Sequence, residues 1–215
     1  MRTITIGRIK TSRTELFDIT KAWLIVSLAF AVVFSSLSLL SGGFSFDRLF
    51  STNFLFVFAV ALVTAGLGFL LHELAHKFVA QHYGCTAEFR SDDMMLYLAL
   101  GLAVIVGFIF AAPGAVMIVG MVTRRENGII SWAGPLTNYI LAMVFLVLMI
   151  LIAPLKPIFS IGFQVNMWLG LFNMIPFGMF DGLKILHWNR WVWGAMVVFG
   201  IAFVFFSGRL LNLFI

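Results

Sequence analysis

The sequence predicts an all-α polytopic membrane protein with about six membrane segments and a small membrane-associated β hairpin or sheet. Of its 215 residues, 62% are hydrophobic and only 11% are charged, which is less charge than a soluble domain carries. Apolar runs of about 20 residues, long enough to cross a bilayer as a helix, recur along the chain. Little sequence is left for a soluble part, so we expect a single intramembrane domain over residues 1–215, with its core at about 54–187.

The first half of the chain contains two clear spans and one ambiguous stretch. Weak alternation over residues 1–21 predicts short strands at the membrane surface, with an amphipathic helix as the alternative. Apolar residues 22–40 predict the first span and residues 54–79 the second. Residues 94–122 are also apolar, but glycines and the Pro113-Gly114 pair interrupt them. This stretch can therefore be either a full span or a re-entrant element.

The second half begins with a tight-turn signal. Asn127-Gly128 predicts a hairpin with residues 115–122 and 128–131 as its two arms. Apolar residues 131–152 then predict a span, residues 158–186 a fifth apolar segment, and a sixth runs from 191 to about 213.

The segment 54–79 carries the most informative motif, which is His72-Glu73-Leu74-Ala75-His76. Two histidines four residues apart project from one face of a helix and can bind one zinc ion. Glu73 would lie beside the metal, where it can take a proton from a zinc-bound water and pass it to a leaving amine. The pattern also arises by chance on solvated helices. Here no charged residue precedes it from 54 to 71, and ionisable groups in hydrocarbon are usually functional. We therefore expect a zinc metalloendopeptidase of the HExxH type within the membrane.

A catalytic zinc ion usually has three protein ligands, so one more is needed. Within the predicted spans, Glu73 and Asp181 are the only carboxylates, which makes Asp181 the expected third ligand. A helix cap is the alternative role for Asp181. His82 and His187 are competing ligands, but both are expected nearer the membrane interface.

The ligand set also predicts a topology. The histidine pair and Asp181 lie at the same depth in the bilayer only if their two segments cross it in the same direction. With one span at 131–152 between them, residues 94–122 must then enter and leave by the same face, which favours a re-entrant element there. With the N-terminus in the cytoplasm, eleven of the 14 Lys and Arg residues then lie on the inner side. We expect a multi-pass cell-membrane protein whose active site lies toward the cytoplasmic side.

Three sequence blocks together resemble the site-2 protease family of intramembrane zinc metalloproteases. They are residues 72–76 (HELAH), 134–138 (GPLTN) and 173–176 (NMIP) followed by Asp181-Gly182. The chain departs from the family pattern in its extra apolar run at about 94–112 and in lacking further prolines after Pro176. No stretch is long enough for the PDZ domain that some members carry.

The resemblance implies a role for each matching residue. In the family, two histidines and an aspartate bind zinc and a glutamate is the catalytic base, which implies His72, His76, Asp181 and Glu73 here. The resemblance further implies that Asn173 contacts substrate or stabilises the oxyanion. It also implies that Asn138 supports the core around the bound substrate.

The expected partners are the lipid bilayer and a membrane-anchored protein substrate with a transmembrane helix, cleaved as in regulated intramembrane proteolysis. Because a helix hides its carbonyls, the substrate must unwind, and it can then add to a strand edge. We place that substrate-binding strand at Ala115, Val116, Met117 and Ile118, with the N-terminal strands as its neighbours. No nucleic-acid motif is present. A divalent-metal transporter or a non-catalytic zinc-binding membrane protein is the alternative, although the chain lacks the repeats common in carriers.

Overall fold

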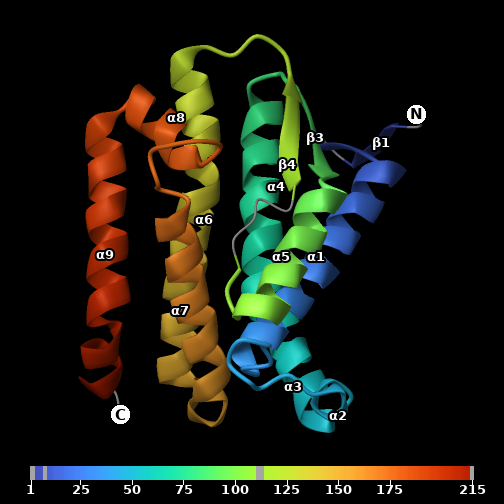
Figure 1. Ribbon diagram of the computed structural model, residues 1–215. Coiled ribbons are helices and arrows are strands. Elements are labelled where there is room, and N and C mark those ends of the chain that lie inside the picture. Colours follow the sequence, from blue (N-terminus) through green and yellow to red (C-terminus); the bar gives the residue numbers. More distant parts are fainter. Residues whose placement is uncertain (1–2, 7–8, 110–113, 214–215) are drawn as a thin grey trace. The chain divides into compact units, whose positions relative to one another are not determined.

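The computed structural model describes residues 3–6, 9–109 and 114–213. The chain divides into two compact units, one formed by Met1–Leu70 with Glu88–Met117 and the other by Leu71–Ala87 with Ile118–Ile215. Helices dominate both units, with short strands in addition (Figure 1). The mainly helical fold that the sequence predicts is confirmed, and the expectation of a single domain stays a prediction.

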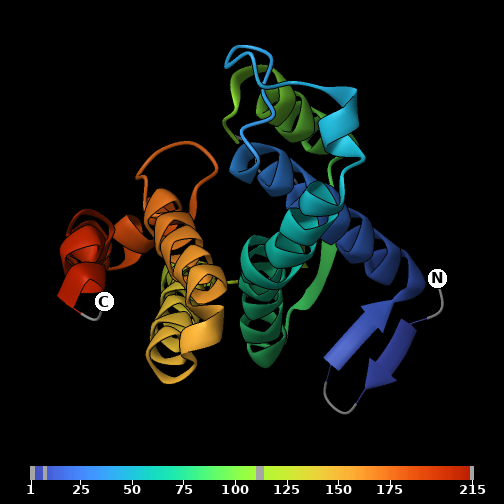
Figure 2. The same cartoon turned by 90° about the horizontal axis from the view of Figure 1, so that it is seen from below.

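The first unit begins with the predicted N-terminal strands. Strands β1 (Thr3–Ile6) and β2 (Ile9–Ser12) pair antiparallel, as Figure 2 shows. Helix α1 (Arg13–Phe34) follows at once, so it begins and ends earlier than the predicted span at 22–40. The reason for the early start is a cap: the Ser12 side chain accepts a hydrogen bond from the Glu15 backbone N–H.

The second predicted span is a continuous helical rod from Thr52 to His82, which follows the short helix α2 (Phe46–Leu49). It consists of α3 (Thr52–Ala61), the π-helical turn η1 (Leu62–Gly66) and α4 (Leu67–His82). Gly84 then takes a left-handed φ of 80°, which ends the helix. The metal-site motif lies in α4, in the part of the helix that belongs to the second unit.

The ambiguous stretch doubles back on itself. Strand β3 (Thr86–Ser91) leads into α5 (Asp93–Val106), and the chain then returns in β4 (Gly114–Val119) to pair with β3. The Lys21 ammonium and the Asp93 carboxylate form an ion pair that joins the N-terminal turn of α5 to α1. The break predicted at Pro113 lies outside the described residues. This return agrees with a re-entrant element, whose depth in the bilayer stays a prediction.

The hairpin predicted around Asn127-Gly128 is wrong. Residues 128–131 are helical, because α6 (Arg124–Leu151) begins at Arg124 and includes the Asn-Gly pair. A capping box explains this start: Thr123 Oγ1 accepts from the Glu126 backbone N–H, and the Glu126 carboxylate accepts from the Thr123 backbone N–H. β4 therefore pairs with β3 instead, and β1 and β2 form a separate sheet.

The fifth apolar segment is also interrupted, although 158–186 was predicted as one element. The short 3-10 turn η2 (Ala153–Leu155) leads into α7 (Lys156–Phe172), and α8 (Asp181–Trp188) follows after a loop at 173–180. Helix α9 (Arg190–Leu213) closes the chain. In the second unit, α6 packs against α7 and α8, and α7 packs against α9. The core of this unit includes Tyr139, Phe145, Phe163 and Met167, all buried.

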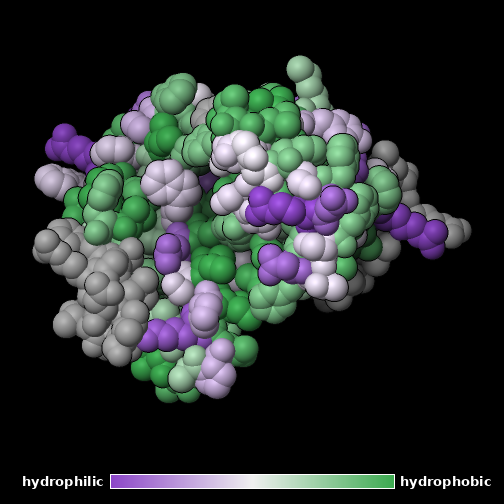
Figure 3. Space-filling model, turned by 60° about the horizontal axis from the view of Figure 1, so that its bottom comes forward, coloured by the Kyte–Doolittle hydropathy of each residue, from purple (hydrophilic) through white to green (hydrophobic). Residues whose placement is uncertain are grey.

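Three helical segments in the described ranges are long and apolar enough to cross a membrane, namely Arg13–Phe34, Thr52–His82 and Arg124–Leu151. Two shorter apolar helices cover Asp93–Val106 and Arg190–Phe205. The described residues thus show three candidate spans and not the six expected. Large apolar side chains such as Leu151 are exposed, and Figure 3 shows hydrophobic residues over much of one face. Such a surface suits contact with lipid.

Candidate metal centre

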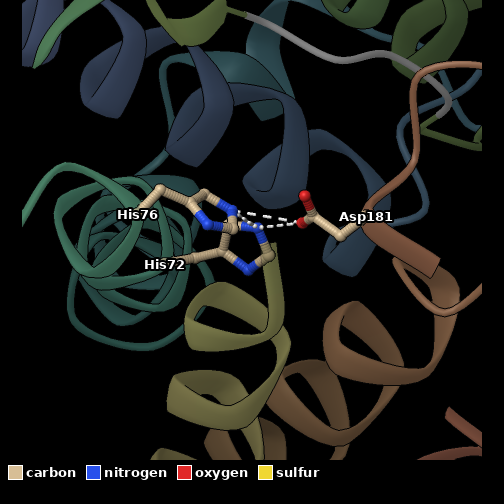
Figure 4. Close-up of side chains that lie close together, drawn as sticks. All are labelled: His72, His76 and Asp181. Carbon is tan, nitrogen blue, oxygen red and sulfur yellow. Dashed lines mark hydrogen bonds and ion pairs between the residues drawn. The ribbon is translucent and has the colours of Figure 1, made fainter. Parts of the chain in front are cut away.

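The three predicted zinc ligands lie together in the second unit. His72 and His76 project from adjacent turns of α4, with ring centroids 4.7 Å apart, and Asp181 approaches them from the first residue of α8 (Figure 4). The Nε2 atoms are 3.0 Å apart, and Asp181 Oδ2 is 3.3 Å from Nε2 of His72 and 3.1 Å from Nε2 of His76. All three side chains are buried.

These distances fit a zinc ion. Zinc binds imidazole nitrogen and carboxylate oxygen at about 2.0–2.2 Å, so neighbouring ligands in a tetrahedral site lie about 3.3 Å apart. The three observed separations fall within a few tenths of an ångström of that value. Two imidazoles and one carboxylate leave a fourth position for water or substrate, as catalytic sites require.

The protonation of both histidines also favours a cation. His72 Nδ1 lies 2.6 Å from Asn138 Oδ1, and His76 Nδ1 lies 2.7 Å from the Ile130 carbonyl oxygen. Because both partners are acceptors, each Nδ1 carries the proton and each neutral ring has a free lone pair on Nε2. With both rings neutral, two lone pairs and a carboxylate oxygen converge on one point. A cation bound among them removes that repulsion.

A chain of amides fixes the orientation of His72. The Asn166 amide N–H donates to the Gly162 carbonyl oxygen at 2.8 Å, which turns the Asn166 side-chain oxygen toward Asn138. The Asn138 amide N–H donates to that oxygen at 3.2 Å, so the Asn138 oxygen faces His72. A backbone carbonyl on α7 therefore sets the tautomer of His72, a candidate metal ligand on α4. Asn166 is fully buried, and it is not among the site residues predicted from the sequence.

Gly134 provides the space for the ligand atoms. This residue lies in α6, and a Cβ built there would lie 2.6 Å from Nε2 of His72 and would also collide with Nε2 of His76. No side chain fits at this position while both imidazoles point at the metal. The glycine that opens the 134–138 block is thus explained by the close approach of α6 to the two imidazoles. Asn138, which ends the same block, accepts the hydrogen bond from His72 Nδ1.

The loop before α8 positions Asp181. The Gly182 backbone N–H donates to the Asn173 carbonyl oxygen at 2.7 Å, and a Cβ on Gly182 would collide with the backbone of Met174. The Trp193 indole N–H donates to the Met174 carbonyl oxygen at 2.9 Å. The loop is therefore held against α8 and α9, and this contact places the Asp181 carboxylate at the histidines.

Glu73 and Asn173 occupy different settings. Glu73 follows His72 on α4 and is half-buried, and the negative charge of Asp181 acts on its carboxylate. Among the described residues, that carboxylate has no hydrogen-bond or ion-pair partner, so it is available to a water molecule. Asn173 ends α7, and its amide donates to the Leu169 carbonyl oxygen at 3.0 Å. Its predicted contact with substrate or oxyanion stays a prediction.

The other predicted residues are placed as follows. Asn138 is buried between His72 and Asn166, and its contact with substrate stays a prediction. In β4, Ala115 and Met117 are exposed while Val116 and Ile118 are half-buried. In the described residues, the alternative ligands His82 and His187 do not belong to the metal-binding cluster.

Comparison with known proteins also indicates zinc. A Methanocaldococcus jannaschii protein named "Putative zinc metalloprotease MJ0611" is 38% identical over 189 residues, which cover 86% of this chain and 90% of that protein. A Bacillus subtilis protein named "Putative zinc metalloprotease YwhC" is 30% identical over 146 residues, which cover 59% of this chain and 67% of that protein. No family model and no solved structure matches the chain. Zinc is the metal that both the relatives and the ligand geometry indicate.

Proposed function

Because the chain belongs to the same zinc metalloprotease family as these two relatives, we propose that it is an intramembrane metalloendopeptidase of the site-2 protease type. Its substrates would be membrane-anchored proteins, cut within a transmembrane segment as in regulated intramembrane proteolysis. One observation carries this proposal: the buried ligands His72 and His76 lie in a helix that is long and apolar enough to span a bilayer. A soluble peptidase has no need of such a helix.

The chain's own residues divide the chemistry between them. Zinc, when bound by His72, His76 and Asp181, polarises the scissile carbonyl and lowers the pKa of a water molecule to about 7. Glu73 accepts the proton of the attacking water and delivers it to the leaving amine. Asn173 has a second amide hydrogen beyond the one that it donates to Leu169, and this hydrogen can stabilise the developing oxyanion.

An unwound substrate needs backbone partners, and β4 offers them. In the described residues, β4 belongs to a two-stranded sheet, so one of its edges lacks a strand partner. On the other strand, β3, the Phe89 backbone N–H donates to the buried Glu15 carboxylate at 2.9 Å. The substrate would therefore add along β4, and the exposed Ala115 and Met117 would contact its side chains.

The charged ends of the first unit support the proposed topology. Near the start of α1, Asp18 lies 3.5 Å from Arg90, and Lys21 pairs with Asp93 at the start of α5. Ion pairs of this kind suit a membrane interface, so α1 and α5 would enter the bilayer from one side. We place that side and the active site toward the cytoplasm, in a multi-pass protein of the cell membrane.

The proposal is tested with purified full-length protein in detergent. Cleavage of a labelled single-span substrate and bound zinc are measured for wild type, Glu73→Gln and the control Glu88→Gln, whose carboxylate pairs with Arg90. We expect wild type and Glu88→Gln to cleave, and Glu73→Gln to keep zinc without cleaving. Zinc binding by all three without cleavage of any substrate in a panel would contradict proteolysis, and zinc flux would be measured next.

A further inference from the structure

A basic pocket lies where the N-terminal end of α6 meets α8, in the second unit. Figure 1 shows these two helices side by side. Its volume is about 500 Å³, and its lining consists of Arg124, Asn127, Leu183, Lys184 and His187. Two of these five side chains carry a permanent positive charge, and no carboxylate lines the pocket. Neither proteolysis nor zinc binding makes use of these residues, except that Lys184 lies near Asp181.

The polar side chains of the pocket are available to a ligand. Within the described part of the chain, the side chains of Arg124, Asn127 and His187 make no hydrogen bond or ion pair. Lys184 has only a long contact, with its Nζ 3.9 Å from Oδ1 of Asp181, and its side chain is 44% exposed. The carboxylate nearest in sequence, Glu126, is engaged with the Thr123 cap. Among the described residues, Arg124 thus has no anionic partner, and Lys184 has only its long contact with Asp181.

The pocket is built on a tight helix contact. Gly128 packs so closely against Trp188 that a Cβ on the glycine would collide with the indole ring. Asn127 and His187 directly precede this pair in the sequence, so the contact fixes their backbones relative to each other. The contact therefore fixes the two helix backbones that carry Arg124 and Lys184, whose side chains are exposed.

The surroundings place the pocket at the level of lipid headgroups. Helix α6 is a candidate membrane span, and Arg124 is its first residue. Just beyond α8, the Trp191 ring is 76% exposed and lies 5.4 Å from the Arg190 guanidinium. Exposed tryptophans gather at the membrane interface, and basic pockets between membrane helices bind anionic headgroups.

We propose that this pocket binds the phosphate oxyanion of a phosphate-bearing ligand, with anionic phospholipid as the source. Arg124 would bind two phosphate oxygens through its guanidinium, Lys184 would supply a point charge, and Asn127 would donate its amide N–H. Leu183 would contact the apolar part of the lipid. Free phosphate has the same oxyanion, so an experiment must distinguish the two sources.

Native mass spectrometry of the zinc-loaded full-length protein in detergent tests the proposal. The probes are dioleoyl phosphatidylglycerol, zwitterionic dioleoyl phosphatidylcholine and inorganic phosphate. We expect one tightly bound phosphatidylglycerol and at least tenfold weaker phosphatidylcholine. Arg124→Gln should weaken phosphatidylglycerol binding about tenfold, the effect of losing one charge-assisted hydrogen bond. Arg125→Gln is the matched control, since Arg125 is exposed and does not line the pocket, and it should change binding less than twofold.

The outcomes are distinct. Equal losses in Arg124→Gln and Arg125→Gln would overturn the proposal, because binding would then reflect diffuse surface charge. Unchanged binding in both Arg124→Gln and Lys184→Gln, with zinc content as the check on folding, would also overturn it. Displacement of the lipid by millimolar inorganic phosphate would support the oxyanion site and identify soluble phosphate as a competing source.

Discussion

Replacing Gly134 by alanine is the sharpest test of the metal-site geometry. Gly134 is buried in α6 and faces the two histidines that we assign to zinc. The substitution adds one methyl group, and it should also raise the helix propensity of α6 by up to about 1 kcal/mol. Any loss of zinc therefore reports on the space around the ligands and not on a weaker helix.

The structure sets the size of the effect. The new Cβ would lie 2.6 Å from Nε2 of His72, whereas ordinary van der Waals contact begins at 3.4 Å, so one of the two must move by about 0.8 Å. Metal–ligand distances tolerate only about 0.2 Å. The imidazole is also tied to Asn138 through Nδ1, so it cannot turn away without breaking that hydrogen bond. We expect zinc affinity to fall at least 10–100-fold, the usual loss when support around a metal site is removed.

The assay is competition for zinc between the purified protein and a chelator of known affinity. Gly194→Ala and Gly101→Ala are matched controls, because both glycines lie in helices and a Cβ at either position meets no atom within 4 Å. Both controls should keep wild-type zinc affinity. If Gly134→Ala also kept it, the close approach between α6 and the histidines would be wrong, and with it the ligand geometry.

Three further predictions concern the groups around the metal. Asn166→Ala should weaken zinc binding about tenfold in the same chelator competition, because His72 loses its orientation, while the exposed Gln164→Ala on the same helix should not. Asn173→Ala should keep zinc but slow peptide cleavage about a hundredfold, and near-normal turnover would exclude it from oxyanion stabilisation. Chelation of zinc should abolish cleavage and lower the melting temperature seen in circular dichroism, with zinc restoring both; an unchanged melting temperature would show that the metal does not stabilise the fold.

The candidate metal ligands could be selected from the sequence because charged groups are scarce in the apolar segments. His72, His76 and Asp181 stand out against long runs without charge, and helix periodicity pairs the histidines. Asn166 carries a weaker version of that signal, as an uncharged polar residue in an apolar run. Gln164, only two residues earlier, carries the same signal but is exposed. Only the fold shows which of the two faces the ligands.

The errors in the predicted elements have local causes. At Asn127-Gly128, the turn signal is overridden by the capping box between Thr123 and Glu126, which starts a helix just upstream. In the fifth segment, continuous hydrophobicity obscured the break, although Pro176 and the left-handed Gly178 mark it. Both errors arose where a short polar or turn signal met a long apolar run. The balance between them depends on tertiary contacts that one sequence does not show.

The site combines groups that are individually costly in an apolar setting, and their arrangement explains how they are accommodated. Each histidine donates from Nδ1 to an acceptor on α6, which is Asn138 for His72 and the Ile130 carbonyl oxygen for His76. Asn138 is itself oriented by Asn166. Every protein partner thus directs an Nε2 lone pair toward Asp181, and none supplies a proton there. A cation at the centre of this cluster would pair with the carboxylate and with both lone pairs, and so would offset the cost of burying them. The hydrogen bonds that satisfy the buried polar side chains therefore also orient the ligand atoms toward one metal position. The same residues join α4, α6 and α8 into one site.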